Sequence, residues 1–323
     1  MAVIDISLNG IAAFKRKSGL RESGKTTDSE RIAKKVSDRK HTRHRRPLRK
    51  QGVEFAAKPA KTARDKGADV AQGKITFRAS NAPAAQEALA WLTAHYGQVP
   101  LDGAGIVVCL GGDGFMLQTL HDTQGSGLPV YGMNCGTVGF LMNTYQAEIL
   151  PERLFAAEEA VINPLAMRAE APDGTVTEAL AINEVSLLRA GPQAAKLRIS
   201  VDGRERLAEL VCDGALLSTP AGSTAYNYSA HGPILPIGAD ILALTAVAAF
   251  RPRRWRGALL PKSAVVRFDV LDHDRRPVRA DADTRAVRRV VSVEIRSEPN
   301  VSHRILFDPG HGLEERLIVE QFA

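Results

Sequence analysis

A glycine-rich turn with one acidic residue is the part of the sequence with the clearest chemistry. Gly111, Gly112 and Gly114 surround Asp113. Glycines at the point where a strand turns into a helix let backbone N–H groups approach a phosphate, and the helix N-terminus adds positive potential. Because a carboxylate repels phosphate, we expect Asp113 to handle a proton or a metal instead. The combination predicts phosphoryl transfer.

Three further segments carry side chains suited to a polar ligand. They are residues 136–141, residues 182–185 and the long run of residues 213–229. The long run is rich in glycine and hydroxylated residues, which place N–H, O–H and C=O groups around a ligand. Within it, Tyr226 can supply an aromatic wall and Asn227 both a donor and an acceptor.

The elements around these motifs alternate between strand and helix in the first part of the ordered chain. The patterns predict a strand at 74–78, a helix with Pro83 in its first turn capped by Ser80 or Asn81, a strand at 106–110, a helix from about 115, and a strand at 128–131. Such alternation is typical of an open, mostly parallel sheet.

The pattern changes near residue 164, where short strands and hairpin signals begin. Turn dipeptides at 173–174 and 202–203 predict hairpins, and strands are expected at 197–201, 265–270 and 290–295. The expected fold is an N-terminal open Rossmann-like α/β domain followed by an antiparallel β-rich domain. A C-terminal helix at 313–318 is expected to return to the first domain. The expected boundaries are 73–163 with the returning tail 303–323, and 164–302.

The charge of the chain lies in one segment. The net charge is +7, but residues 1–72 hold 19 Lys and Arg against 8 Asp and Glu, while the other residues hold 24 against 28. Residues 1–72 are therefore expected to be a basic, mostly disordered extension or the result of a wrongly chosen start site. The alternative is a tether to nucleic acid or another anionic surface. Residues 19–26 match the P-loop pattern but lack the flanking strand and helix, so no P-loop is expected.

Cysteine and hydropathy patterns bound the environment and the cofactors. Cys109, Cys135 and Cys212 are odd in number and lack zinc spacing, which favours reduced thiols. No segment approaches the ~20 apolar residues of a membrane span, and no signal peptide is evident. We therefore expect a cytoplasmic protein. The eight histidines show no ligand spacing, so no protein-built metal site is expected.

The four motifs together resemble the ATP-dependent NAD kinase family, particularly its alphaproteobacterial branch. The likeness covers residues 74–323, and the run Thr-Pro-x-Gly-Ser-Thr-Ala-Tyr-Asn-x-Ser is its most specific part; residues 133–136 and 307–311 also match. The resemblance implies transfer of the γ-phosphoryl of ATP to the 2′-hydroxyl of the adenosine ribose of NAD, giving NADP. It also implies Mg²⁺ or Mn²⁺ carried by the ATP phosphates, and a homodimer or homotetramer.

The resemblance also implies roles for particular residues. Asp113 would be the proton acceptor, and Gly111, Gly112 and Gly114 would let the triphosphate approach. The NAD site would comprise Asp113, Gly114, Asn183, Glu184, Asp213, Ala221, Thr224, Ala225, Tyr226, Asn227, Tyr228, Ser229 and, matching a backbone-contact position, Ala248.

Each of these assignments has a purely structural alternative. Asp113 could bond nearby N–H groups in a turn, Asn183 and Glu184 could be a polar pair on an edge strand, and Asp213 could begin a hairpin. Phe140 could be core or ligand wall. Arginines within residues 251–256 could steer phosphates or form a subunit contact.

The sequence also departs from the family at three positions. Thr284 stands where relatives often have His, and Ala246 and Ala249 stand where Pro is common. Two other functions stay open at this point. One is a lipid kinase with the same glycine turn, and the other is a non-catalytic nucleic-acid tether through residues 1–72.

Overall fold

The computed structural model describes residues 74–136, 139–253 and 255–310. The expectations for residues 1–72, including the P-loop match at 19–26, lie outside this part of the chain, as does the helix expected at 313–318. Among the described residues, no helix is both long and apolar enough to cross a membrane.

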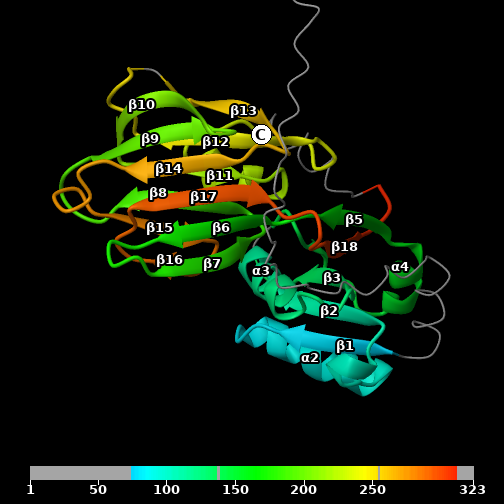
Figure 1. The fold of residues 1–323 in the computed structure, drawn as a ribbon. Helices are drawn as coiled ribbons and strands as arrows, with labels where there is room; N and C mark the ends of the chain where they lie inside the picture. Colours follow the sequence, from blue (N-terminus) through cyan, green and yellow to red (C-terminus); the bar gives the residue numbers. More distant parts are fainter. Residues whose placement is uncertain (1–73, 137–138, 254, 311–323) are drawn as a thin grey trace, which may run out of the picture. The chain divides into compact units, whose positions relative to one another are not determined.

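A mixed sheet holds the glycine-rich turn (Figure 1). Its strand order is β1-β2-β3-β18-β5, with β4 beside β3. The strands from β1 to β18 run parallel, whereas β5 is antiparallel to β18. The bounds are β1 (Ile75–Ala79), β2 (Ile106–Gly111), β3 (Pro129–Asn134), β4 (Asn143–Thr144), β5 (Glu158–Ile162) and β18 (His303–Phe307). Every residue of β2 is buried, as expected for a central parallel strand.

The helices begin differently from the sequence-based expectation. The helices accompanying this sheet are α2 (Pro83–Tyr96), the short turn η1 (Leu101–Gly103), α3 (Asp113–Asp122) and α4 (Leu150–Ala156). The N-cap of α2 is Ala82, without a side-chain cap, so the expected cap at Ser80 or Asn81 is wrong. Helix α3 begins at Asp113 rather than at 115, because Gly112 is the extended N-cap residue. Asp113 therefore sits at a helix N-terminus, where negative charge is favoured.

The second half of the chain forms two antiparallel sheets. One has the order β10-β9-β14-β17-β6-β7 and the other β13-β12-β11-β8-β15-β16. The bounds in the first are β6 (Leu165–Glu170), β7 (Val176–Ala181), β9 (Ala195–Val201), β10 (Arg204–Cys212), β14 (Val266–Val270) and β17 (Ser292–Ser297). Those in the second are β8 (Glu184–Arg189), β11 (Gly214–Ser218), β12 (Ile241–Val247), β13 (Gly257–Pro261), β15 (Val278–Ala282) and β16 (Arg285–Val287).

Both predicted hairpins are confirmed. Strands β6 and β7 pair around Gly174, whose φ is +81°, and β9 and β10 pair around Asp202 and Gly203, whose φ values are +52° and +72°. Two consecutive left-handed residues are what a two-residue hairpin turn requires, and Asp202 and Gly203 supply them with little strain. The hairpin between β6 and β7 has a longer loop, in which Gly174 alone is left-handed.

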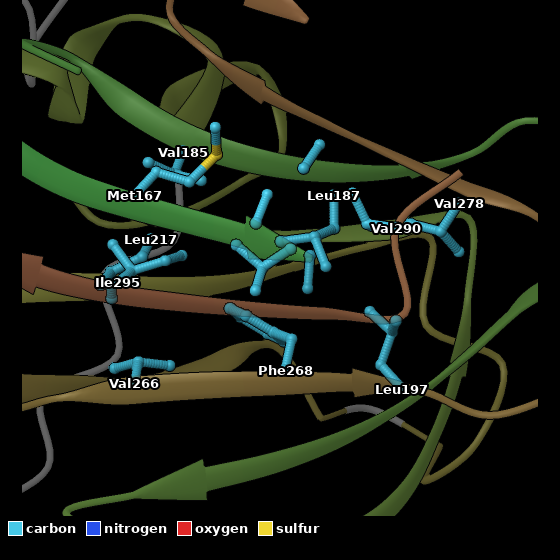
Figure 2. Close-up of a cluster of buried hydrophobic side chains, with 14 of the residues drawn as sticks. Met167, Val185, Leu187, Leu197, Leu217, Val266, Phe268, Val278, Val290 and Ile295 are labelled. Carbon is cyan, nitrogen blue, oxygen red and sulfur yellow. The ribbon is translucent and has the colours of Figure 1, made fainter. Parts of the chain in front are cut away.

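The two antiparallel sheets bury one hydrophobic cluster to which both contribute (Figure 2). In β9 the buried residues alternate with more exposed ones, so Leu197 and Ile199 point the same way. Phe268 of β14 and Leu217 of β11 meet in this cluster from different sheets. The period-two pattern thus fixes which face of each strand is buried.

A second cluster positions the residues of interest, and we call it the α3 cluster. It contains Met116 and Leu120 of α3, Leu141 of the segment that follows β3, and Ile182 and Ala221 of the second half of the chain. All five are less than 10% exposed. Packing against a common set of side chains therefore links the glycine-rich turn to the residues around 182 and 221.

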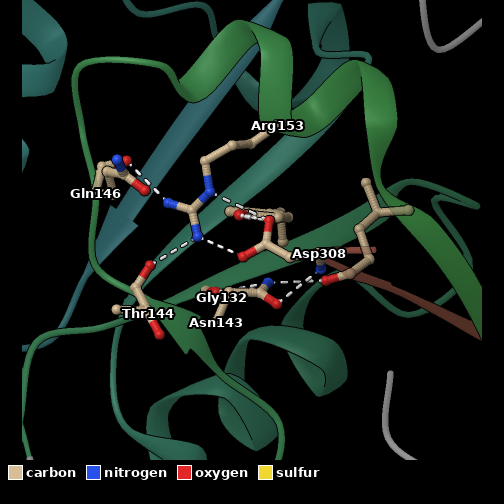
Figure 3. A network of polar contacts seen from close by, with 8 residues as sticks. Gly132, Asn143, Thr144, Gln146, Arg153 and Asp308 are labelled. Carbon is tan, nitrogen blue, oxygen red and sulfur yellow. Dashed lines mark hydrogen bonds and ion pairs between the residues drawn. The ribbon is translucent and has the colours of Figure 1, made fainter. Parts of the chain in front are cut away.

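Polar contacts fasten the strand β18 into the first sheet (Figure 3). Arg153 of α4 forms an ion pair with Asp308, and the Tyr131 hydroxyl donates to the same carboxylate. The Asn143 amide donates to the carbonyls of Gly132 and Leu306. Strand β18 was not predicted from the sequence. Its partners, β3 and β5, lie far away in the sequence, so no hairpin or turn signal marks this strand.

Candidate functional site

The carboxylate of Asp113 is held by the chain segment that follows β3. Its Oδ2 accepts the N–H of Phe140 at 2.7 Å and its Oδ1 accepts the N–H of Leu141 at 2.9 Å. Gly139 packs closely against it, since an added Cβ would lie 2.8 Å from Asp113 Cγ. A carboxylate offers about four lone-pair positions, so two remain for a further donor such as a hydroxyl. Asp113 can therefore bond the backbone N–H groups of a neighbouring segment and still accept a proton from a ligand.

The glycines around Asp113 differ in the space above them. A Cβ on Gly111 would meet Phe115 at 3.1 Å, whereas a Cβ on Gly112 or Gly114 would meet no atom within 4 Å. Gly114 is exposed in the first turn of α3. There the N–H groups of Phe115 and Met116 bond the Gly112 carbonyl, whereas those of Asp113 and Gly114 have no intrahelical acceptor. Gly112 and Gly114 thus leave an open approach to the N-terminus of α3.

The turn before β8 is fixed from both sides by buried side chains. Asp283 accepts the N–H of Ile182 at 2.6 Å through Oδ2, and those of Asn183 and Glu184 at 3.0 and 3.3 Å through Oδ1. On the other side, the Thr219 hydroxyl donates to the Ile182 carbonyl at 2.7 Å, and its N–H donates to the Asn183 carbonyl at 2.9 Å. The backbone at Asn183 is therefore rigidly placed.

The segment after β11 lies directly against this turn. The N–H of Gly222 donates to the Thr219 hydroxyl, and an added Cβ on Gly222 would lie 2.5 Å from Asn183 Cα. Two short elements follow, η2 (Ala221–Thr224) and α5 (Tyr226–Ser229). Burial and Asp283 raise the pKa of the Glu184 carboxyl, and the backbone N–H of Tyr226 beside it partly offsets this. The structure thus brings Asn183, Glu184, Ala221, Thr224, Ala225 and Tyr226 together.

Glu184 has unusual electrostatics within this group. Burial, and then the charge of Asp283, raise the pKa of Glu184 from 4.5 to about 8. Its Oε2 is buried and has no hydrogen-bond partner. A buried carboxyl oxygen without a partner is costly unless a ligand group bonds it. Glu184 is therefore available to a polar group of a bound ligand.

The raised pKa of Glu184 predicts how stability depends on pH. A carboxyl whose pKa is higher in the folded state makes the fold less stable as pH rises from about 4.5 to about 8. We expect Glu184→Gln to be more stable than the unsubstituted chain at pH 9, on the order of 1–3 kcal/mol, since one pKa unit corresponds to about 1.4 kcal/mol and solvent reduces the effect. The difference should shrink towards pH 5.

Thermal unfolding at several pH values measures this effect. Glu178→Gln is the control, because Glu178 is an exposed carboxyl on β7. Its unfolding should match that of the unsubstituted chain at every pH. A Glu184→Gln variant whose stability gain is the same at pH 5 and pH 9 would contradict the account.

Asn227 has a structural part in this group. Its side chain is fully buried, and its amide donates to the carbonyls of Ser223 and Pro233 and accepts the Thr245 hydroxyl. Both amide hydrogens are engaged, so Asn227 has no donor left for a ligand. By contrast, Tyr228 is 45% exposed and Ser229 is also exposed.

Asp213 and Ala248 lie at the other end of the same sheet. Asp213 precedes β11 and pairs with Arg189 at 2.6 Å, and its N–H bonds the carbonyl of Val247, next to Ala248. Strand β11 has five residues, and a rise of about 3.3 Å per residue separates its ends by roughly 16 Å. The length of β11 therefore separates Asp213 and Ala248 from Glu184. Burial and nearby charges, that of Asp213 among them, nevertheless raise the pKa of Tyr226, so Asp213 acts on a member of this group.

Two of the structural alternatives are wrong. Strand β8, which begins at Glu184, lies between β11 and β15 and is not an edge strand. Asp213 does not begin a hairpin, because it connects β10 to β11 in the other sheet. The core alternative for Phe140 is supported, since its ring packs against the α3 cluster.

One departure from the family has a visible consequence. The N–H of Ala246 donates to the carbonyl of Arg256 at 3.0 Å, a bond that a proline at this position could not make.

Arg251 and Arg256, at the two ends of the basic run, are exposed.

Three buried or half-buried residues of the site were missed in the sequence. Asp283, Thr219 and His121 each bond a neighbour that positions the turn before β8. Thr219 belongs to the motif that was recognised, and a buried Thr after a strand is a usable signal. Asp283 directly precedes Thr284, one of the positions at which the sequence departs from the family.

Within the described ranges, no group of three or more His, Cys, Asp or Glu side chains is placed to hold a metal ion. The three cysteines are free thiols. The site offers backbone N–H groups, carboxylates and a small number of hydroxyls.

Two family models match the chain in sequence. The ATP-NAD kinase N-terminal domain matches residues 31–163, and the ATP-NAD kinase C-terminal domain matches residues 182–295. The first match begins inside the segment expected to be an extension.

Individual proteins agree with the family models. An NAD kinase of Cereibacter sphaeroides (strain ATCC 17023) is 72% identical over 250 residues, which are 77% of this chain and 98% of that protein. An NAD kinase of Caulobacter vibrioides is 58% identical over 250 residues, 77% of this chain and 96% of that protein.

Two solved structures have a similar fold. A yeast NADH kinase complexed with NADH has a TM-score of 0.67 at 20% identity, covering 77% of this chain and 86% of that one. An NAD kinase from Archaeoglobus fulgidus in complex with ATP has a TM-score of 0.60 at 21% identity, covering 76% and 96%. At these identities the likeness establishes the fold alone.

Proposed function

This chain belongs to the ATP-NAD kinase family, and from that premise we propose how its residues carry out the reaction. The enzyme is an NAD kinase that uses ATP to phosphorylate NAD, giving NADP. The comparisons do not support a lipid kinase or a nucleic-acid tether.

We assign the proton transfer to Asp113. The acceptor is the 2′-hydroxyl of the adenosine ribose, a poor nucleophile near neutral pH, and a placed carboxylate can take its proton as the new P–O bond forms. The two N–H bonds from Phe140 and Leu141 hold the carboxylate in one orientation. This fixed carboxylate at the start of α3 is the observation that carries the proposal.

The open side of the glycine turn is the proposed place of the triphosphate. First-turn N–H groups of α3 and the helix dipole stabilise the charge that builds on the transferring phosphoryl group. Mg²⁺ or Mn²⁺ would be carried by the phosphates and would neutralise part of that charge.

The NAD site is proposed to be the group around Glu184. Asn183, Thr224, Ala225 and Tyr226 would line it, and the unpartnered Glu184 Oε2 would bond a polar group of the dinucleotide. Asp213, whose charge acts on Tyr226, and Ala248 at the far end of β11 are proposed as further contacts to NAD. We also propose domain boundaries at 73–163 and 164–302. We further propose that the chain forms a homodimer or homotetramer, and light scattering would measure its molar mass in solution.

Gly114→Ala separates stability from phosphate binding. Alanine favours a helix over glycine by roughly 0.5–1 kcal/mol, and the added Cβ meets no protein atom within 4 Å. We therefore expect the variant to unfold at a slightly higher temperature. The same Cβ would project into the proposed triphosphate approach, so the KM for ATP should rise about tenfold, or 1.4 kcal/mol of lost binding.

Thermal unfolding and steady-state kinetics are the two measurements for Gly114→Ala. Gly191→Ala serves as the control, since its Cβ would make an ordinary contact of 3.7 Å with Pro277. An unchanged KM for ATP in the Gly114 variant would remove the triphosphate from this turn.

A coupled assay tests the proposed function as a whole. The purified chain is incubated with ATP, Mg²⁺ and NAD, and a dehydrogenase specific for NADP reports the product. We expect NADP from the unsubstituted chain and only background from Asp113→Ala. Equal NADP formation by both proteins would remove Asp113 from the mechanism.

A further inference from the structure

A hydrogen-bonding contact between His121 and the buried Asp283 joins the two parts of the proposed site. The Asp283 side chain is fully buried, and its Oδ2 lies 2.7 Å from Nε2 of His121. His121 is near the C-terminal end of α3, the helix that begins with Asp113. A single carboxylate thus contacts both the turn before β8 and the helix that carries the proposed proton acceptor.

The bonds to Asp283 leave it little freedom. Three backbone N–H groups, from Ile182, Asn183 and Glu184, and the His121 ring all donate to its two oxygens. Asp283 itself has a φ of +49°, in the turn between β15 and β16. Non-glycine residues adopt this conformation at some cost, and it persists where the surroundings hold it.

The surroundings of the carboxylate contain one more histidine. His303 at the start of β18 is buried, and its ring centroid lies 6.4 Å from that of His121. Burial lowers the pKa of His303 to about 4, so this ring is neutral near pH 7. The Glu184 carboxyl is the other titratable group whose charge Asp283 influences. His121 is therefore the side chain that directly holds the Asp283 carboxylate.

We propose that Asp283 and His121 are a positioning pair that sets the distance between the NAD-binding turn and the helix bearing Asp113. Neither residue needs to touch a substrate in this role. Asp283 orders the backbone of Asn183 and Glu184, and His121 fixes that carboxylate to α3, a rigid rod of about 1.5 Å per residue. The inference rests on the proposed function, because it assumes that NAD binds at the turn and that Asp113 is the acceptor.

Substitution of His121 tests the pair with limited damage to the fold, because its side chain is 25% exposed. We expect His121→Ala to raise the KM for NAD about tenfold or more, with the KM for ATP changed less than about twofold, because the NAD-binding turn held by Asp283 would lose its contact with α3. His121→Gln should restore most of the loss, because its amide N–H reaches the position of Nε2.

The partner residue gives a second, independent arm. Asp283→Asn should weaken NAD binding in calorimetry. The double variant with His121→Ala should bind NAD only slightly less tightly than the single variant with the lower affinity, as expected for two residues acting through one contact. Asp308→Asn is the matched control. It removes another carboxylate that bonds a cationic side chain and a hydroxyl, so it should lower the unfolding temperature and leave the KM for NAD unchanged.

Two results would overturn the positioning pair. One is an unchanged KM for NAD in His121→Ala, and the other is an equal rise in Asp308→Asn, which would indicate general destabilisation. Failure of the proposed function is recognised separately, because the unsubstituted chain would then form no NADP or Asp113→Ala would remain active.

Discussion

Replacement of Asp113 by asparagine should lower kcat by roughly 10²–10⁴-fold, the usual contribution of a placed general base. An amide keeps the size of the side chain but cannot take a proton from the ribose hydroxyl. It also presents an NH₂ group to one of the two N–H donors of Phe140 and Leu141, so the segment after Gly139 should loosen. The expected loss lies mainly in kcat, because the proton moves only in the transition state.

The kinetic constants separate the two roles of Asp113. If the side chain served only to hold the Phe140–Leu141 backbone, the variant would show a raised KM with kcat preserved. Asp122→Asn is the control on the same helix, since Asp122 forms a half-exposed pair with Arg78. We expect that control to keep nearly full activity. Steady-state kinetics with both substrates varied, together with thermal unfolding, decides between the roles.

Substitution of Gly222 by alanine should nearly abolish NAD phosphorylation. The added Cβ would overlap the backbone of Asn183, at 2.5 Å from its Cα, and backbone atoms cannot swing away as a flexible side chain can. Overpacking of this kind costs about 1–3 kcal/mol of folding stability. Because Asn183 is also held by Asp283 and Thr219, the strain should move the turn itself and reduce kcat/KM for NAD on the order of 10²-fold.

Calorimetric titration with NAD and thermal unfolding together test the Gly222 prediction. Gly191→Ala again supplies the control, with full NAD binding expected. Retention of normal NAD affinity by a folded Gly222→Ala variant would show that the close approach of Gly222 to Asn183 is not needed for the site.

The sequence was most informative where the signal was local. The buried strand before the glycine turn, and the Asp-Gly turns at 173–174 and 202–203, are short patterns whose own backbone requirements select the structure. Helix α3 begins two residues before the position expected from the sequence, because the glycines on both sides of Asp113 have low helix propensity. That difference matters, since it puts Asp113 itself in the first turn.

The long-range contacts of the site were beyond the reach of sequence patterns. The bond between His121 and Asp283 joins residues 162 positions apart, and no period or turn signal relates them. Likewise, the engagement of both Asn227 amide hydrogens within its own loop depends on Ser223 and Pro233 folding back over it. Residue type alone could not separate this structural role from ligand binding.

The proposed reaction transfers the γ-phosphoryl of ATP to the 2′-hydroxyl of the adenosine ribose of NAD. The most direct test gives the purified chain γ-labelled ATP with Mg²⁺ and either the 2′-deoxy or the 3′-deoxy form of that ribose in NAD. We predict label in the 3′-deoxy dinucleotide, and none in the 2′-deoxy dinucleotide even when calorimetry shows that it binds. Label in the 2′-deoxy dinucleotide would contradict the account.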